Sequence, residues 1–300
     1  MQRACQTGGV TDDFAHLVAA KRGARIAVCI PALNEAATIG RVAAEVRTLV
    51  EGGLVDELIV MDDGSTDATA LHAQASGARV VSVTSVLPQV GPGAGKGEVL
   101  WKSLAVTTGD IVCWVDADIE NISPTFITGL LAPLLTNPDI HFVKGHYRRP
   151  VGEDPTGGGR VTELAARPLI SRFFPELARF PQPLSGEFAG RRHVLEAIPF
   201  VQGWGVDLAL LIDISALVGV HRMATADLGT RIHRNRSLRQ LGPQAMAVQG
   251  VVLRRAGKLP SGSGAPERDV LLRPAADGLS IEQVYVEVRE RPPMATILRR

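Results

Sequence analysis

Cysteine is scarce in this chain, and its charges of opposite sign nearly balance. Only three cysteines occur among the 300 residues, and Cys5, Cys29 and Cys113 share no close spacing. A disulfide framework or a zinc site needs paired or closely spaced cysteines, so we expect free thiols, buried in apolar strands at Cys29 and Cys113. Free thiols suit a reducing cytoplasm. The formal net charge of +1 argues against a general binder of nucleic acids or other polyanions.

Long apolar runs are missing as well. The longest hydrophobic stretches are interrupted by charged residues or glycine, and the N-terminal segment is polar. A membrane span needs about 20 apolar residues in a row, and a secretory signal needs an apolar core. A cytoplasmic protein without a membrane partner is therefore expected. The content of 45% hydrophobic and 21% charged residues can bury a sizeable core, in one large domain or in two fused lobes.

The first half of the chain alternates strand and helix patterns. Apolar strand runs are expected at residues 25–31, 56–61, 79–83 and 110–115. Helices are expected at residues 35–50 and 96–107, and another is expected to begin at Ser123 and Pro124, with serine as the N-cap. Such an alternation predicts an α/β fold with a mostly parallel sheet.

Past residue 150 the rhythm changes. A glycine-rich turn, several helical stretches and fewer strand runs predict a second, smaller lobe. Residues 258–280 are rich in Gly, Pro and Ser and indicate a linker, with a late edge strand expected at 283–288. The expected division is an N-terminal extension (1–24), two halves (25–150 and 151–257), and a linker with a C-terminal tail (258–300).

Two carboxylates, Asp116 and Asp118, follow the strand run that ends at residue 115. Open α/β sheets bind ligands just beyond the carboxyl ends of their strands. Carboxylates this close repel each other unless fixed donors or a hard cation hold them, and Mg²⁺ or Mn²⁺ carried on a diphosphate is such a cation. The pair predicts metal-assisted nucleotide chemistry; the alternative is a solvated turn after a strand.

A glycine-rich loop at residues 91–97 includes Lys96. Clustered glycines let backbone N–H groups and a lysine approach an anion at a helix start, so phosphate contact and a plain connector are both open. The loop lacks the Walker A pattern, which requires glycine at Val90 and Ser or Thr at Gly97. A dinucleotide fingerprint is absent too, because residues 31–35 contain no glycine. Neither an ATPase nor a dehydrogenase is favoured.

Three motifs at the ends of expected strands together resemble the nucleotide-sugar half of a GT-A glycosyltransferase. They are Pro-Ala-Leu-Asn-Glu at 31–35, Asp-Asp-Gly-Ser-Thr-Asp at 62–67 and Asp-Ala-Asp at 116–118. Further stretches are similar to the glucosyl-3-phosphoglycerate synthase family and its mannosyl-transferring relatives. These are residues 157–164, 182–187, 233–236 and 291–294. The resemblance covers most of the chain.

The resemblance implies a GT-A fold, that is, a Rossmann-like, mostly parallel sheet flanked by helices, with a smaller acceptor-binding lobe. It implies a homodimeric, metal-dependent retaining enzyme that uses Mg²⁺ or Mn²⁺ to move glucose from UDP-glucose or GDP-glucose to 3-phosphoglycerate. A mannosyl-3-phosphoglycerate synthase using GDP-mannose is the alternative, because the motifs do not separate sugars that differ at C2. A non-catalytic nucleotide-sugar-binding protein ranks lower, because Asp116, Asp118 and His233 are all present. An enzyme acting on a lipid phosphate ranks low without a membrane-facing segment.

The resemblance also implies roles for individual residues. The nucleotide-sugar side would comprise Pro31, Leu33, Glu35, Asp63, Lys96, Asp116 and Ala117. The metal would be held by Asp118 and His233, although a lone histidine is more often structural. The phosphoglycerate site would comprise Gly159, Arg160, Thr162, Arg231 and Asn235. The residues at the reacting atoms would be Asp207, Leu184 (through its backbone carbonyl) and Arg160.

Three positions depart from the pattern of the family. Asp207 stands where the family has glutamate, so its reach is one methylene shorter. Asp63 and Ala117 stand where close relatives have serine, and Asp63 bears on the choice between uridine and guanosine donors.

Basic residues cluster in the second half, which independently favours a small, strongly anionic acceptor. Guanidinium forks bind phosphate and carboxylate bidentately; for several members the alternative is a solvated surface position. The members are Lys144, Arg148, Arg149, Arg160, Arg231, Arg234 and Arg236. Arg160 is the strongest candidate, because it follows three glycines that let backbone and side chain close on a ligand together.

Overall fold

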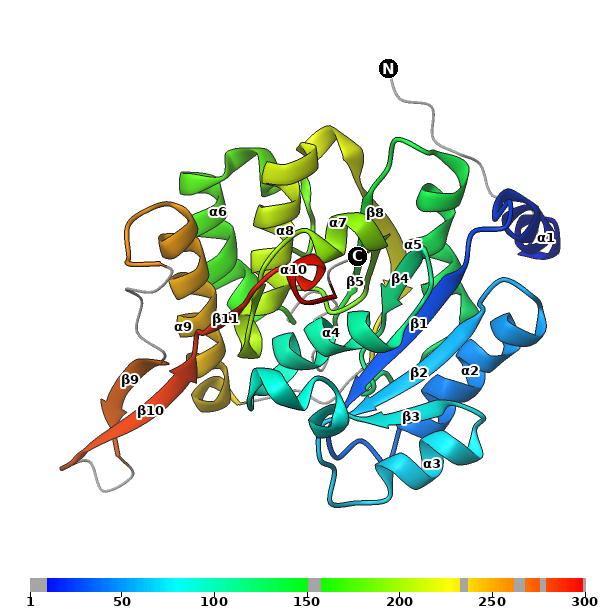
Figure 1. The fold of residues 1–300 in the computed structure, drawn as a ribbon. Helices are drawn as coiled ribbons and strands as arrows, with labels where there is room; N and C mark the ends of the chain where they lie inside the picture. Colours follow the sequence, from blue (N-terminus) through cyan, green and yellow to red (C-terminus); the bar gives the residue numbers. More distant parts are fainter. Residues whose placement is uncertain (1–9, 151–157, 233–236, 262–267, 276–278, 299–300) are drawn as a thin grey trace.

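The fold is built around one seven-stranded sheet with the strand order β3-β2-β1-β4-β6-β5-β8 (Figure 1). The computed structural model describes residues 10–150, 158–232, 237–261, 268–275 and 279–298. The strands of the sheet are β1 Ile26–Ala32, β2 Glu57–Asp62, β3 Arg79–Ser82, β4 Ile111–Trp114, β5 Phe142–Arg148, β6 Phe188–Arg191 and β8 Met223–Thr230. The four strands β1, β2, β3 and β4 run parallel to one another, and β5 runs parallel to β8. β6 is antiparallel to both β4 and β5. The predicted mostly parallel α/β sheet is confirmed.

Helices cover both faces of the sheet (Figure 1). Because successive side chains of a strand point to opposite faces, Val28 and Ile30 pack with α2 and α5, whereas Cys29 packs with α4 and α8. Burial on both faces explains why the strands read as continuous apolar runs. The helices are α1 Val10–Ala20, α2 Ile39–Glu51, α3 Thr69–Ala75, α4 Gly95–Val106, α5 Pro124–Thr136, α6 Arg167–Phe173, α7 Arg192–Glu196, α8 Val206–Val218, α9 Leu238–Arg255 and α10 Met294–Leu298.

The two described cysteines are free and buried, as predicted. Cys113 lies opposite Val28 in the register of β4 with β1, so its thiol faces the α2 side of the sheet while that of Cys29 faces the α4 side. Burial raises the pKa of Cys29 to about 12 and also raises that of Cys113 well above its usual value. Neither thiol is therefore a nucleophile at neutral pH. Cys5 lies outside the described residues.

One helix start and one helix cap differ from the prediction. The helix expected from residue 35 begins only at Ile39. The preceding residues form a loop in which Asn34 has a positive φ of 56°, and the backbone N–H groups of Asn34 and Glu35 donate to the hydroxyls of Ser65 and Thr69. α5 begins at Pro124 as predicted, but the hydroxyl of Ser123 contacts the hydroxyl of Thr125 rather than capping the backbone.

The C-terminal region contains more structure than its composition predicts. The linker expected at 258–280 is wrong for its central part, because β9 (Arg268–Pro274) pairs antiparallel with β10 (Ile281–Glu287), which confirms the late strand. β11 (Glu290–Arg291) then pairs with β7 (Phe200–Val201). The division of the chain at residues 24, 150 and 257 stays a prediction. Within the described ranges, no helix combines the length and the apolar character needed to cross a bilayer.

Candidate active site

A cavity of about 610 Å³ opens at the carboxyl ends of β1, β2 and β4, and we call it the strand-end pocket. The three acidic strand-end motifs meet there, because the ends of parallel strands share one edge of the sheet. The lining comprises Pro31, Ala32, Leu33, Asn34, Glu35, Asp63, Gly95, Lys96, Val99, Asp116, Ala117, Asp118 and Trp204. All seven residues predicted for the nucleotide-sugar side are among them.

The loops after β1 and β2 fix each other at this edge. Asn34 has a positive φ of 56°, and its side-chain oxygen accepts a hydrogen bond of 2.8 Å from the backbone N–H of Thr66. The Asp67 carboxylate accepts from the backbone N–H groups of Ala36 and Thr69, and its hydrogen bond with the Thr69 hydroxyl lowers the pKa of Asp67. These reciprocal bonds hold the rim of the strand-end pocket in one shape.

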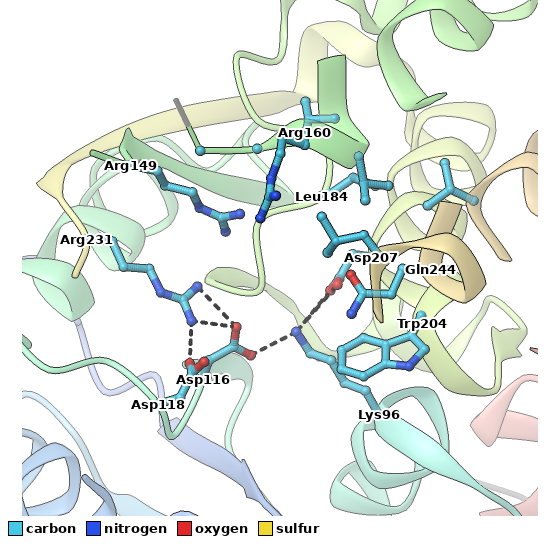
Figure 2. A pocket seen from close by; sticks show the side chains of 16 residues that line it. Lys96, Asp116, Asp118, Arg149, Arg160, Leu184, Trp204, Asp207, Arg231 and Gln244 are labelled. Atoms are coloured by element: carbon cyan, nitrogen blue, oxygen red, sulfur yellow. Dashed lines mark hydrogen bonds and ion pairs between the residues drawn. The ribbon is translucent and has the colours of Figure 1, made fainter. Parts of the chain in front are cut away.

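A second cavity of about 170 Å³ adjoins the first, and we call it the arginine pocket. Lys96, Asp116, Asp118 and Trp204 line both pockets, so the two meet at these side chains. The other residues of its lining are Arg149, Gly158, Gly159, Arg160, Val161, Thr162, Leu184, Asp207, Arg231, Leu241, Gln244 and Val248. In Figure 2 the side chains of Arg149 and Arg160 point toward the space above Asp116 and Lys96.

Lys96 lies between two carboxylates at the junction of the pockets (Figure 2). Its ammonium is 2.8 Å from Asp116 Oδ1 and 3.3 Å from Asp207 Oδ1. Burial opposes the charge of Lys96, but Asp116 and Asp207 outweigh it and raise its pKa well above the usual value. Burial likewise disfavours ionised Asp116, yet Lys96 and Arg231 hold its pKa below its usual range. Both groups are therefore charged at neutral pH.

Arg231 is the centre of a buried charge network. Its side chain is only 4% exposed, and Nη1 donates to Glu187 Oε1 at 2.7 Å and to the Tyr147 hydroxyl at 2.8 Å. The guanidinium also donates to Asp116 Oδ2 at 3.2 Å and to Asp118 Oδ1. Burial opposes the charge, but Glu187 and the other acidic neighbours keep the pKa of Arg231 well above its usual value. Arg231, predicted to bind the acceptor, thus also fixes both carboxylates of the Asp-Ala-Asp motif.

Gly186 allows this network to close. A Cβ atom at Gly186 would lie 2.2 Å from Asp116 Oδ2, which is far inside van der Waals contact. The stretch at residues 182–187 therefore needs glycine where it passes the carboxylate, and it presents Leu184 to the arginine pocket.

Asp118 is the predicted ligand of a divalent cation that lies among the described residues. No group of three His, Cys, Asp or Glu side chains suited to a metal forms within that part of the chain, and His233 and Asn235 lie outside it. The side chain of Asp118 is 33% exposed, and it borders both pockets. A partly exposed carboxylate oxygen fits Mg²⁺ or Mn²⁺, which prefer hard oxygen ligands.

The predicted acceptor residues that are described lie together in the arginine pocket. Gly159 adopts a positive φ of 78°, and its carbonyl accepts from the backbone N–H of Glu163. This turn places Arg160 and Thr162 on the pocket wall. Arg149 joins them, and its guanidinium lies 4.9 Å from the centre of the Tyr147 ring.

The prediction of a basic acceptor cluster is wrong for Lys144. This side chain is 1% exposed, donates to the backbone carbonyl of Asp207 at 3.1 Å and lies 4.4 Å from the centre of the Phe188 ring. Burial lowers the pKa of Lys144 to about 8. Lys144 borders neither pocket and fixes the start of α8 instead. Arg148 is exposed and lines neither pocket, whereas Arg234 and Arg236 are outside the described residues.

The sequence alone assigned no role to four residues of the site, namely Trp204, Gln244, Tyr147 and Glu187. Trp204 lines both pockets, and its place between two glycines at 203–205 is the signal that could have revealed it. Gln244 comes from α9, and Tyr147 and Glu187 are buried beside Arg231. Glu187 ends the family-like stretch at 182–187, which is the signal that could have revealed it. Tyr147 and Gln244 have no local motif, because they reach the site only through tertiary packing.

Comparison with known proteins agrees with this geometry. Residues 27–198 match the model of glycosyl transferase family 2. The glucosyl-3-phosphoglycerate synthase of Mycolicibacterium smegmatis is 48% identical over 289 residues, covering 94% of this chain and 93% of the relative. That of Petrotoga mobilis is 43% identical over 286 residues, covering 92% and 88%.

Solved structures of the Mycobacterium tuberculosis glucosyl-3-phosphoglycerate synthase are also similar. One, in complex with Mn²⁺, UDP-glucose and phosphoglyceric acid, has a TM-score of 0.85 and 44% identity, covering 99% of this chain and 97% of that chain. Another, with Mg²⁺ and UDP, has a TM-score of 0.84 and 44% identity, covering 99% and 98%. The predicted fold and family are confirmed: the chain belongs to glycosyl transferase family 2 and, within it, to the glucosyl-3-phosphoglycerate synthases.

Proposed function

We propose that this enzyme transfers glucose from UDP-glucose to 3-phosphoglycerate with retention of the anomeric configuration. The observation that carries the proposal is the junction of an acidic strand-end pocket with an arginine pocket at Lys96, Asp116 and Asp118. A nucleotide sugar fits the first pocket and a small phosphorylated acid fits the second, so the two substrates would meet at the shared side chains. UDP-glucose and phosphoglyceric acid are bound together in the M. tuberculosis relative.

The described residues suit the roles that this reaction requires. Lys96, held in its charged form, supplies positive charge beside the donor diphosphate. Asp118, with His233, would hold a divalent cation, which when bound neutralises charge on the leaving diphosphate. Arg160 and Arg149 would bind the phosphate and carboxylate of the acceptor. The backbone carbonyl of Leu184 is the group that we place nearest the reacting carbon.

A front-face displacement agrees with the absence of an evident protein nucleophile among the described pocket residues. The bond from the anomeric carbon to the diphosphate oxygen breaks, and its electron pair stays on that oxygen. The acceptor hydroxyl oxygen bonds to the same carbon on the same face, and its proton passes to the leaving diphosphate. The Asp207 carboxylate is held by Lys96, so it suits a sugar hydroxyl better than it suits covalent attack.

The direct test incubates the purified protein with 3-phosphoglycerate and Mg²⁺ and, in parallel, UDP-glucose, GDP-glucose and GDP-mannose. Released nucleotide is quantified, and the linkage of the product is determined by NMR. The highest kcat/KM is expected with UDP-glucose, giving an α-linked product. A preference for GDP-mannose would replace the proposal by mannosyl transfer, and absence of turnover with every donor would favour a binding role.

Arg160→Ala is expected to raise the KM for 3-phosphoglycerate roughly 10- to 100-fold, because a charge-assisted hydrogen bond contributes about 1.5–3 kcal/mol. The KM for UDP-glucose should change less than threefold, on the order of 0.6 kcal/mol. Arg148→Ala is the matched control, because Arg148 is an exposed neighbour that lines neither pocket. Equal increases in both KM values would remove Arg160 from the acceptor site.

We also propose a homodimer, in which the β9–β10 hairpin docks on a second copy of the chain. The hairpin projects from the body of the molecule in Figure 1, and Leu272, Ile281 and Tyr285 on it are 59%, 70% and 62% exposed. Such a group of exposed apolar side chains suits burial between copies.

Light scattering after size exclusion should give twice the 31.9 kDa of one chain. Ile281→Glu should shift the mass toward the monomer, because it places a charge in the apolar contact. A monomeric wild type at micromolar concentration would contradict this assembly.

A cytoplasmic location remains our proposal, and the two buried free thiols support it.

A further inference from the structure

The stretch at residues 291–294 resembles the family in sequence, but the resemblance assigns it no role. The structure places this stretch against α4, next to the active site. Arg291 pairs with Phe200 in the two-stranded ladder of β11 and β7. The indole N–H of Trp101, on α4, donates to the carbonyl of Pro292 at 2.8 Å, and Met294 is fully buried. The segment is thus fixed against α4, the helix that carries Lys96.

The Arg291 side chain contacts both α4 and the loop before it. Its Nε and Nη2 atoms form a bidentate pair with Glu98, at 2.6 and 2.9 Å. Its Nη1 and Nη2 atoms donate to the carbonyls of Val90 and Gly91, at 2.8 and 2.9 Å. One guanidinium therefore ties the C-terminal segment to residues 90–91 and to the first turn of α4.

Glu98 forms the floor of the glycine loop. Its side chain is 1% exposed, and its other cationic partner is Lys102 at 3.4 Å. A Cβ atom at Gly93 would lie 2.2–2.6 Å from the carboxylate atoms of Glu98, so the loop rests directly on this group. The loop then leads to Gly95 and Lys96, which both line the strand-end pocket.

The geometry indicates a positioning role beyond stability. A buried ion pair is weak evidence for stability, because apolar side chains of similar volume serve as well or better. An apolar replacement for Arg291 would not supply the two donors that hold the carbonyls of Val90 and Gly91. The pair therefore specifies the path of the loop, which is what a binding site needs.

The charge of Glu98 also affects the pKa of Asp63, which lines the strand-end pocket. Burial, together with the carboxylates of Glu98 and Asp62, raises the pKa of Asp63 to about 6, and Lys102 opposes this rise. Asp63 lines the pocket, whose other charged side chains are Glu35, Lys96, Asp116 and Asp118. Arg291 offsets part of the charge of Glu98, so its loss is expected to raise the pKa of Asp63 further.

We propose that Arg291 is a positioning residue for donor binding, which holds the glycine loop at the strand-end pocket and balances the charge of Glu98 beneath it. The inference rests on the proposed function, because it assigns this pocket to the nucleotide sugar. The C-terminal segment then belongs to the donor site, although none of its residues lines the pocket among those described.

The test compares Arg291→Gln with Arg255→Gln. Arg255 is a matched control, because it also forms a bidentate pair, with Asp213 at 2.6 and 2.8 Å, and also contacts the C-terminal segment through Glu290. Arg291→Gln should raise the KM for UDP-glucose about tenfold, as expected for loss of a charge-assisted bond, and leave that for 3-phosphoglycerate unchanged. Arg255→Gln should lower Tm without changing either KM.

A pH series provides a readout that a merely structural role would not move. Calorimetric titration with UDP-glucose and Mg²⁺ avoids the acceptor, and the esterified diphosphate of UDP-glucose does not titrate between pH 5 and 8. A histidine titrates in this range, and His233 as a proposed metal ligand is common to wild type and variants, so the readout is the difference between their midpoints. An ionised carboxylate accepts a nucleobase N–H more strongly than a protonated carboxyl group does, so wild-type affinity should rise with pH through about 6 and then level. The midpoint should move upward in Arg291→Gln and return to or below the wild-type value in the double variant with Glu98→Gln.

Arg291→Lys keeps the charge but loses the bidentate fork, and it replaces Arg291→Gln if that variant fails to fold. It should give an intermediate KM for UDP-glucose with an unmoved midpoint. A folded Arg291→Gln variant with wild-type donor affinity and a wild-type midpoint would overturn this inference but not the proposed function. Wild-type protein that binds no UDP-glucose would overturn the proposed function and this inference with it.

Discussion

Asp118→Ala is expected to lower kcat on the order of 1,000-fold while the protein stays folded. Cation stabilisation of a leaving group contributes several kcal/mol, and each 1.36 kcal/mol corresponds to about a tenfold change in rate. The fold should persist, because the Asp118 side chain is one third exposed, and Arg231 keeps Glu187 and Asp116 as partners when Asp118 is removed.

Turnover would be measured over a titration of Mg²⁺ and of Mn²⁺, with urea unfolding as the check on the fold. Asp139→Ala is the matched control, because Asp139 is an exposed carboxylate in the turn before β5. A high concentration of either cation should fail to rescue Asp118→Ala if the ligand itself is lost. Unchanged turnover in a folded Asp118→Ala variant would remove Asp118 from the metal site.

Arg231→Leu should lower the free energy of unfolding by about 3–5 kcal/mol, because it leaves a buried carboxylate without its partner. Glu187 is fully buried, and Arg231 is its ion-pair partner among the described residues. Removing Glu187 as well, in the double variant Glu187→Leu with Arg231→Leu, should recover part of the loss, because an apolar pair carries no uncompensated charge.

Urea unfolding followed by circular dichroism measures this effect. Arg273→Leu is the matched control, because Arg273 also makes a bidentate pair, with Glu282 at 3.0 and 3.1 Å. That pair is partly exposed, with side chains 21% and 37% accessible, so its loss should cost less than about 1 kcal/mol. Similar losses for Arg231 and Arg273 would show that the buried network does not stabilise the fold as its burial suggests.

The strand-end chemistry could be predicted because it is local in sequence. An apolar run followed at once by Asp116 and Asp118 fixes both the element and the edge of the sheet, so no tertiary information is needed. The same holds for the turn at Gly159, where three glycines precede Arg160. From these motifs, the first half of the sheet and the lining of the strand-end pocket could be predicted.

Other parts depend on contacts between distant segments. Lys144 is buried because β5 lies against Phe188 and the start of α8, yet its sequence reads only as one more basic residue. β9 forms within a stretch rich in Gly, Pro and Ser because β10 is available to pair with it. The role of Arg231 as the hub of three carboxylates cannot be read from one position, because Asp116 and Asp118 lie in the loop between β4 and α5 whereas Glu187 lies just before β6.

The antiparallel strand β6 has a consequence for the order in which the chain folds. β6 lies between β4 and β5, so the edge of β4 stays unpaired until residue 191 has been synthesised. An unpaired edge invites pairing with other chains, and growing chains carry such edges until their partners emerge. A fragment that ends at residue 150 would keep this open edge permanently. The functional division that we expect near that residue is therefore not a division into independently folding units.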